Sequence, residues 1–347
     1  MAYTDIDKPS DYFNTAPYSG DSNTTQAITG VGFQPDWVWI KSRSSAANHN
    51  LWDIIRGTSK YLKSNSTDAE ITDATLFNSF NSDGFTVGNG GIVNDSGQTY
   101  VGWCWKGANG TASNTDGSIT STVSANTTSG FSIVGYTGTL STDTVGHGLG
   151  TTPNIIIVKN RTTAQNWSVN GNVGGLIYGT NKLLLQGTDA LISDTNEVTS
   201  ANTTTFSLSN SIATNESGSN LIAYCFAEKK GFSKFGSYTG NGSTNGTFVY
   251  TGFKPAFVIT KRTDGTVDWY MFDNKRQNSF NVVNGMLRPS ATSTELDESS
   301  VYVDFLSNGF KWRGNNAGNN TSGGSYIYMA FAENPFVTST GIPACAR

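Results

Sequence analysis

The stretch Gly32-Phe33-Gln34-Pro35-Asp36-Trp37-Val38-Trp39-Ile40-Lys41 contains the signals that decide the fold. Its run Trp37-Val38-Trp39-Ile40 is short, aromatic and β-branched, which is typical of a strand buried on both faces. Pro35 has no N–H to donate to a neighbouring strand, so it fits the start of a strand and not its middle. Gly32 permits a turn conformation that a Cβ atom would oppose. We expect Lys41 to reach solvent where the strand ends.

The same pattern occurs three times along the chain. In each copy a tyrosine opens a Tyr-Ser/Thr-Gly triplet, and a proline follows it at a constant offset (18 to 35, 136 to 153 and 238 to 255). The other fixed positions are the glycines Gly32, Gly150 and Gly252 and the lysines Lys41, Lys159 and Lys261. The strand runs in the second and third copies are Ile155-Ile156-Ile157-Val158 and Phe257-Val258-Ile259-Thr260. Repetition of this kind indicates three diverged copies of one structural unit.

Each copy also ends alike, with the strands Tyr100 to Trp105, Leu221 to Phe226 and Tyr326 to Phe331. Many short strands separated by Asn/Gly-rich turns predict an all-β fold of three tandem β-sandwich or jelly-roll-like domains. The predicted division is an N-terminal arm (1–11), repeat one (12–108), a linker (109–127), repeat two (128–230), repeat three (231–336) and a C-terminal tail (337–347). The repeats can stand in a row or around a pseudo-threefold axis, and both arrangements stay open.

Composition agrees with a β fold and narrows the function. Aromatic residues make up 12% of the chain and charged residues only 14%, which is unlike a disordered protein. A net charge of −4 gives no basic footprint for nucleic acid. The sequence has no apolar run long enough to predict a membrane-spanning segment, and the first residues lack the features of a signal peptide. Cys104 and Cys225 occupy equivalent positions in two copies, where Ala330 stands in the third, so we expect each to be buried in its own domain and unpaired.

No motif for catalysis or for a cofactor is visible. The two histidines have no nucleophile at a known spacing, so we expect His49 to be a solvated loop residue and His147 a turn residue. Calcium is a weaker alternative at the acidic groups Asp5, Asp7 and Asp11, or Glu295, Asp297 and Glu298, since neither matches an EF-hand loop. We therefore expect no enzyme activity, no cofactor and no metal.

The tryptophans are the candidate ligand-binding residues. Trp37, Trp39, Trp103 and Trp105 align with apolar core residues in the other copies, so a core role is expected for them. Trp52, Trp167 and Trp269 lie in more polar stretches, one in each copy. These three are the candidate glycan-binding residues, although packing is the simpler explanation.

Three stretches carry a resemblance to a known family: Asp5 to Asn14, Gly32 to Lys41 and Ala330 to Pro335. They resemble a domain of unknown function in tail-fibre-like structural proteins of marine and cyanobacterial phages. The similarity covers nearly the whole chain. It implies a virion protein, made in the host cytoplasm, and brings no catalytic residues.

The leading hypothesis is therefore a tail fibre or other appendage of a phage particle, an adhesin with host surface glycans as candidate ligands. The first alternative is a capsid decoration or head-fibre protein. A surface polysaccharide hydrolase is the alternative that the sequence favours least, because it needs two suitably spaced carboxylates. Expected partners are other virion proteins, further copies of the chain and host glycans, with no nucleic acid and no membrane insertion.

Overall fold

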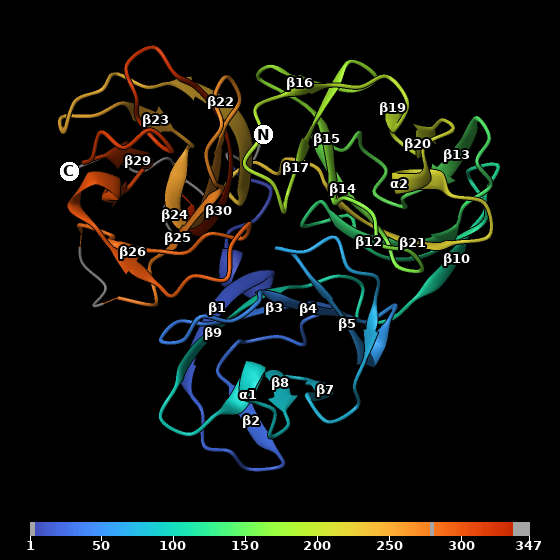
Figure 1. The fold of residues 1–347 in the computed structure, drawn as a ribbon, viewed down its shortest axis with the longest axis horizontal. Helices are drawn as coiled ribbons and strands as arrows, with labels where there is room; N and C mark the ends of the chain where they lie inside the picture. Colours follow the sequence, from blue (N-terminus) through green and yellow to red (C-terminus); the bar gives the residue numbers. More distant parts are fainter. Residues whose placement is uncertain (1–3, 278–280, 336–347) are drawn as a thin grey trace.

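The computed structural model describes residues 4–277 and 281–335, and their regular structure is nearly all β. Strands account for 46% of the chain and helices for 4%, which confirms the predicted all-β class. Three lobes lie around a common centre, one for each copy of the repeat (Figure 1). We call residues 12–108 lobe 1, residues 109–230 lobe 2 and residues 231–335 lobe 3. Of the two arrangements left open by the sequence, the chain adopts the one around a pseudo-threefold axis.

Each lobe contains a large antiparallel sheet with the same central order. In lobe 1 the order is β1 (Phe13–Ser19), β9 (Thr99–Trp105), β3 (Trp37–Ser42), β4 (Asn50–Asp53), β5 (Gly57–Lys63), β6 (Ile71–Thr72). In lobe 2 it is β10 (Ala112–Asn114), β11 (Ser121–Asn126), β12 (Phe131–Thr137), β21 (Asn220–Phe226), β14 (Ile155–Asn160), β15 (Ser168–Val173), β17 (Asn181–Leu184), β18 (Ile192–Ser193), with β16 (Leu176–Ile177) paired to β15. In lobe 3 it is β22 (Ser233–Thr239), β30 (Ser325–Pro335), β24 (Phe253–Arg262), β25 (Tyr270–Asp273). The last strand of every copy thus lies beside the same strand, which follows the proline in lobes 1 and 2 and contains it in lobe 3, where Pro255 lies at a register shift within β24.

A smaller three-stranded sheet faces the large one in each lobe. Its strands are β2 (Gln26–Thr29), β8 (Gly84–Val87) and β7 (Phe77–Asn81) in lobe 1; β13 (Asp143–Gly146), β20 (Thr205–Leu208) and β19 (Val198–Ala201) in lobe 2; β23 (Phe248–Tyr250), β29 (Gly309–Trp312) and β28 (Val303–Leu306) in lobe 3. The remaining elements are the hairpin β26 (Gly285–Met286) and β27 (Leu296–Asp297), and the short turns η1 (Pro9–Asp11), α1 (Gly91–Asn94), α2 (Ile212–Asn215) and η2 (Ser299–Val301). Each lobe is therefore a small sandwich, as predicted.

The central strands are buried on both faces because they face two different cores. In β3, Val38 and Ile40 pack inside lobe 1, whereas Trp37 and Trp39 point toward the centre of the molecule. The registers pair Val38 with Cys104, Ile156 with Cys225 and Val258 with Ala330. This confirms that the two cysteines and the alanine are equivalent, and both cysteines are buried and free.

The second core is shared by all three lobes and is rich in aromatic rings. Phe13 of lobe 1 stacks on Phe331 of lobe 3, with ring centroids 5.2 Å apart, and Trp37 stacks on Tyr224 of lobe 2 at 4.4 Å. A cavity of only about 20 Å³ remains among these rings. Because such large buried side chains cost about 3–5 kcal/mol when truncated to alanine, this core holds the lobes together as one unit.

Two segments outside the repeats belong to the lobes. Residues 109–127, predicted as an exposed linker, contain β10 and β11, which extend the large sheet of lobe 2. The linker prediction is wrong there because Val123 pairs with Val134 and is buried, which supplies the apolar contact that the composition did not suggest. In the N-terminal arm, Ile6 joins the shared core and Asp5 N donates to Lys230 O. The predicted tail 337–347 lies outside the described residues.

The three repeat lysines are buried, so the prediction that they end the strands near solvent is wrong. The Lys159 ammonium donates to Thr67 O in lobe 1 at 3.2 Å, and that of Lys261 to Thr188 O in lobe 2 at 2.9 Å. Lys41 donates to the Ser42 and Ser45 carbonyls of its own lobe. Burial lowers the pKa of each lysine to about 8. Each strand continues one residue past its lysine, and the lysine ammonium groups bind backbone carbonyls instead of reaching solvent.

Candidate functional site

The three candidate glycan-binding tryptophans are buried, with exposures of 0% (Trp52), 0% (Trp167) and 2% (Trp269). The Trp52 ring stacks on Phe77 inside lobe 1. Trp167 Nε1 donates to Lys63 O of lobe 1, and Trp269 Nε1 to Leu184 O of lobe 2, each at 2.8 Å. The assignment of these residues to glycan binding is corrected on this ground, because no ring face is free to stack on a sugar.

Strand register also changes which of these residues are equivalent. Trp52 lies opposite Val38, and the residues in its place are Asn170 and Phe272. Trp167 and Trp269 lie four positions before Gly171 and Asp273, as His49 lies before Asp53. His49 is therefore the lobe 1 counterpart of the two junction tryptophans. It is buried, and its Nδ1 accepts a hydrogen bond of 2.9 Å from Trp39 Nε1.

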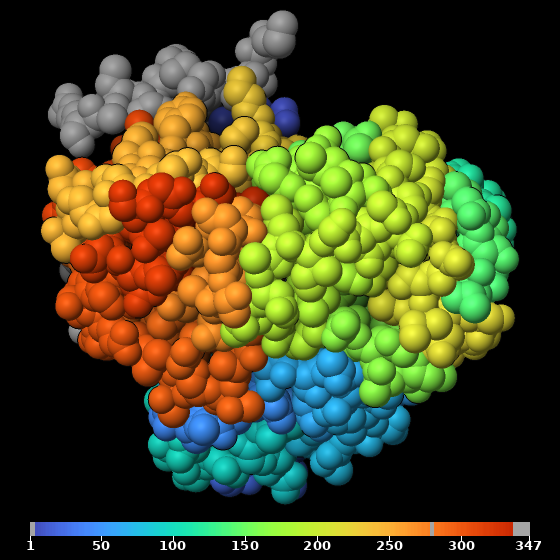
Figure 2. All heavy atoms as spheres, turned by 45° about the horizontal axis from the view of Figure 1, so that its top comes forward, coloured from blue at the N-terminus to red at the C-terminus, as the bar shows by residue number. Residues whose placement is uncertain are grey.

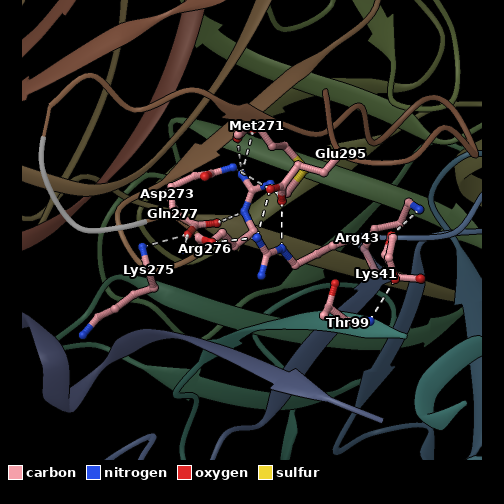
Figure 3. Close-up of polar contacts among 12 residues, drawn as sticks. Lys41, Arg43, Thr99, Met271, Asp273, Lys275, Arg276, Gln277 and Glu295 are labelled. Atoms are coloured by element: carbon pink, nitrogen blue, oxygen red, sulfur yellow. Dashed lines mark hydrogen bonds and ion pairs between the residues drawn. The ribbon is translucent and has the colours of Figure 1, made fainter. Parts of the chain in front are cut away.

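The junction between lobes 3 and 1 (junction 3/1) contains a cluster of charged side chains (Figure 3). Asp273, at the end of β25, binds Arg276 through a 2.5 Å ion pair, and both side chains are fully buried. Glu295 accepts from Arg276 at 2.7 Å and from Arg43 of lobe 1 at 2.9 and 3.0 Å. Arg43 reaches the cluster because its own backbone carbonyl accepts from Glu295 N.

The junction between lobes 1 and 2 (junction 1/2) repeats this cluster. Asp53 and Arg56 form a buried ion pair of 2.5 Å. Glu70 accepts from Arg161 of lobe 2 at 2.8 and 3.1 Å, and Glu70 N donates to Arg161 O. The four residues occupy the same places as Asp273, Arg276, Glu295 and Arg43. An Asp-x-x-Arg motif that starts at the last residue of β4 and of β25 is the sequence signal for both clusters, and it is not among the predicted sites.

The neighbouring lobe completes each aspartate's hydrogen bonding. Tyr224 Oη of lobe 2 donates to Asp53 Oδ2 at 2.7 Å, and Trp103 Nε1 of lobe 1 donates to Asp273 Oδ2 at 2.9 Å. The two donors are equivalent, because Tyr224 pairs with Ile157 and Trp103 with Trp39. At both of these junctions, a buried aspartate of one lobe therefore accepts a hydrogen bond from an aromatic side chain of the next lobe.

The contacts within the cluster at junction 3/1 favour the charged forms of Glu295 and Arg276. Burial alone would raise the pKa of Glu295, but the hydrogen bonds from Arg43 and the charge of Arg276 lower it below its ordinary value. Burial would likewise lower the pKa of Arg276, and the Asp273 and Glu295 charges raise it instead. Groups held in one charge state by several partners do not exchange protons near neutral pH. The charged Glu295 is therefore suited to holding lobes 3 and 1 together, since it pairs with Arg276 of its own lobe and with Arg43 of lobe 1.

The junction between lobes 2 and 3 (junction 2/3) lacks the whole cluster. Gly171 and Gly174 stand in place of the Asp and Arg, Leu191 in place of the Glu, and Thr263 in place of the second Arg. The backbone contact is kept, since Leu191 N donates to Thr263 O at 2.9 Å, as in the other two junctions. The residue equivalent to Trp103 and Tyr224 is Met329, whose side chain has no N–H or O–H group to donate a hydrogen bond.

A groove of about 540 Å³ opens at junction 2/3. Its lining residues include Gly174, Leu191, Thr263, Asp264 and Ser325. Three of these are the replacements for charged cluster residues at the other junctions. In the space-filling view, the lime-green atoms of lobe 2 meet the gold and orange atoms of lobe 3 along a seam (Figure 2). This groove is the candidate binding site of the molecule.

The other predicted groups have structural partners. His147 is buried, accepts from Leu149 N through Nδ1 and contacts Asn202 O through Nε2. Glu295, one of the residues considered for calcium, binds the two arginines of junction 3/1. Among residues 4–277 and 281–335, no group of three or more His, Cys, Asp or Glu side chains is placed to hold a metal. Within the same residues, no helix has the length and apolarity to cross a bilayer.

Comparison with known proteins identifies the family of this chain. A family described as a domain of unknown function, DUF7483, matches residues 8–335. No curated protein and no solved structure matches the chain. The matched residues include all three lobes and all three junctions. The chain therefore belongs to the DUF7483 family.

Proposed function

We propose that this chain is a structural protein of a phage particle, a tail fibre or related appendage that contacts the host surface. The observation that carries the proposal is the closed ring of three lobes around one aromatic core. A single polypeptide thereby builds a unit that other proteins build from three subunits. Such a unit presents loops of three lobes at once and needs no subunit association to do so.

The chemistry of the junctions supports a structural role. The Asp–Arg pairs of junctions 1/2 and 3/1 are fully buried, and the partly buried Glu–Arg pairs beside them join one lobe to the next. Cys104 and Cys225 are buried free thiols in equivalent strands, so the fold does not depend on their oxidation. Burial raises the pKa of both thiols, which makes them unreactive. A protein built in a reducing cytoplasm and then exposed on a particle needs these properties.

A capsid decoration protein is the second candidate, and the pseudo-threefold arrangement favours it. Three similar lobes present three similar surfaces, which suits a site on a shell where three subunits meet. The appendage and the decoration protein differ in location and in copy number, so one measurement separates them.

The experiment is immunogold labelling of purified particles combined with quantitative mass spectrometry. The appendage predicts label at the tail and a copy number far below that of the major capsid protein. Label over the head in a number comparable to the capsid subunits would replace it with the decoration role. Expression in infected cells with no label on particles would overturn both.

A further inference from the structure

Because the three lobes are related by pseudo-symmetry, equivalent positions at the three junctions can be compared directly. Junctions 1/2 and 3/1 fill the same position with two arginines, an aspartate and a glutamate, and junction 2/3 fills it with two glycines, a leucine and a threonine. The lobes still meet at junction 2/3, through the Leu191–Thr263 backbone bond and through Trp269 Nε1 bound to Leu184 O. The cluster is thus dispensable for docking two lobes, and its removal leaves a groove.

We propose that this groove binds a short neutral oligosaccharide. Its volume of about 540 Å³ lies within the range of small-ligand sites, roughly 300–1,000 Å³. The side chains of Ser237, Thr239 and Ser325 bring exposed hydroxyls to it, whereas Thr263 is buried and its hydroxyl donates to Ser325 O. Hydroxyls donate and accept hydrogen bonds, as sugar hydroxyls require. Leu191 adds an apolar surface for the C–H face of a sugar ring.

Asp264 gives the groove a carboxylate acceptor. Its Oδ1 accepts from Arg262 at 2.7 Å and its Oδ2 from Ser325 N at 3.1 Å, so the carboxylate is held in place. Each oxygen has a second lone pair for a ligand hydroxyl, and hydrogen bonds to a charged acceptor are the stronger kind. A carboxylate fixed in this way can accept from neighbouring hydroxyls of a sugar.

The same lining disfavours an acidic ligand. No lysine or arginine is among the described residues that line the groove, and the nearby Arg262 is already paired with Asp264, so the lining offers no free cation to a sulfate, a phosphate or a uronic acid. A neutral sugar meets hydroxyls, one carboxylate and an apolar side chain, which are the groups present. The inference rests on the proposed host-facing role, and it names the ligand class for it.

The test uses the full chain on a printed array of neutral and acidic oligosaccharides, and positive compounds are titrated by calorimetry. We expect neutral oligosaccharides to bind. Asp264→Asn should weaken binding about tenfold or more, because it removes a charged acceptor. The double variant Leu191→Glu/Thr263→Arg rebuilds at junction 2/3 the ion pair of the other junctions, and it should abolish binding while the melting temperature stays near that of the parent.

Thr24→Arg is the matched control, since Thr24 lines an open hollow of about 570 Å³ in lobe 1 that has no vacated cluster. This variant should bind like the parent. The inference is overturned if no neutral oligosaccharide binds, or if binding survives in the Leu191→Glu/Thr263→Arg variant. Binding of acidic oligosaccharides in place of neutral ones, blocked by that double variant, would overturn the neutral ligand class. Sugar binding by a protein absent from particles would overturn the proposed function alone.

Discussion

The indole nitrogen of Trp103 donates a 2.9 Å hydrogen bond to Oδ2 of Asp273, although 170 positions separate the two residues. The bond joins lobe 1 to lobe 3 at full burial. Asp273 also binds the Arg276 guanidinium, whose centre lies 5.6 Å from the Trp103 ring. One aspartate therefore orients both an arginine of its own lobe and a tryptophan of the next. The closure of the ring depends on such contacts between the first and the last lobes.

Replacing Asp273 by alanine should destabilise the whole molecule. The change leaves the buried Arg276 guanidinium with Glu295 and two backbone carbonyls but without its fully buried carboxylate, and breaking a buried pair on one side costs about 3–5 kcal/mol. Equilibrium unfolding in guanidinium chloride, followed by tryptophan fluorescence, measures the loss.

The control removes both charges, in Asp273→Ala/Arg276→Met. Junction 2/3 already lacks the equivalent pair, so the double variant should lose less free energy of unfolding than Asp273→Ala alone. Additive losses from the two single changes would show that the ion pair is not the coupled unit described here.

The repeat itself could be predicted from the sequence because its markers are local. The Gly, Pro and Lys positions lie at constant offsets in each copy, and the equivalence of Cys104, Cys225 and Ala330 follows from aligning the terminal strand of each copy. The ring could not be predicted. An apolar run such as Trp37-Val38-Trp39-Ile40 shows that both faces are buried, but it does not say whether the second face meets a neighbouring lobe or another chain.

The junction sites were missed for a different reason. Trp52 was matched with Trp167 and Trp269 by residue type, and strand register places His49 with them instead. The glycan assignment failed because polar neighbours in sequence do not imply exposure: Trp167 Nε1 finds its acceptor, Lys63 O, 104 positions away. The vacated cluster at junction 2/3 becomes visible only when the three copies are aligned by register.

His49 should make the fold sensitive to mild acid. Burial lowers its pKa well below the ordinary value, and the nearby Lys41 and Arg276 cations lower it further. A group whose pKa is lower in the folded state favours the unfolded chain once the pH falls below about 6.5, where the unfolded histidine takes up a proton. His49→Gln keeps an acceptor for Trp39 Nε1 and should lose less stability than the parent between pH 7 and pH 5.

The measurement is the free energy of unfolding of both proteins at several pH values, compared as a difference. The difference is needed because Asp36, whose pKa burial raises to about 6, contributes with the opposite sign between about pH 4 and 6. His147 is also buried and has a lowered pKa, but it is present in both proteins, so its contribution to the pH dependence cancels in the difference. Parallel pH profiles of parent and variant would contradict the role given to His49.

The buried lysines should give a second, alkaline dependence. The pKa of Lys159 is about 8 in the folded chain and about 10.4 when unfolded, so folding is penalised below pH 8 and the penalty fades as the pH rises toward 10.4. Lys159→Met removes this dependence. The parent should therefore gain up to about 1 kcal/mol per pH unit relative to the variant between pH 8 and 9.5.

A Cys104→Ala/Cys225→Ala background is suited to this comparison, since ionisation of the unfolded thiols would otherwise lower stability in the same pH range. Lobe 3 shows that alanine is accepted at this position, because Ala330 is fully buried there. A variant that follows the parent with pH would mean that Lys159 keeps an ordinary pKa in the folded protein.

Lobe 1 should not fold when it is expressed alone as residues 12–108. Its large sheet would then expose the face that carries Trp37, Trp39, Trp103 and Trp105, all of which are now buried in the shared core. The buried Asp53–Arg56 pair would also lose Tyr224 as a partner.

Calorimetry of the full chain should accordingly show one cooperative transition, with equal calorimetric and van't Hoff enthalpies. The isolated lobe should bind a hydrophobic dye and show little dispersion in its amide proton spectrum. If lobe 1 instead melted cooperatively near the temperature of the full chain, its own sandwich core would be sufficient, and the shared core would join the lobes without being needed to fold them.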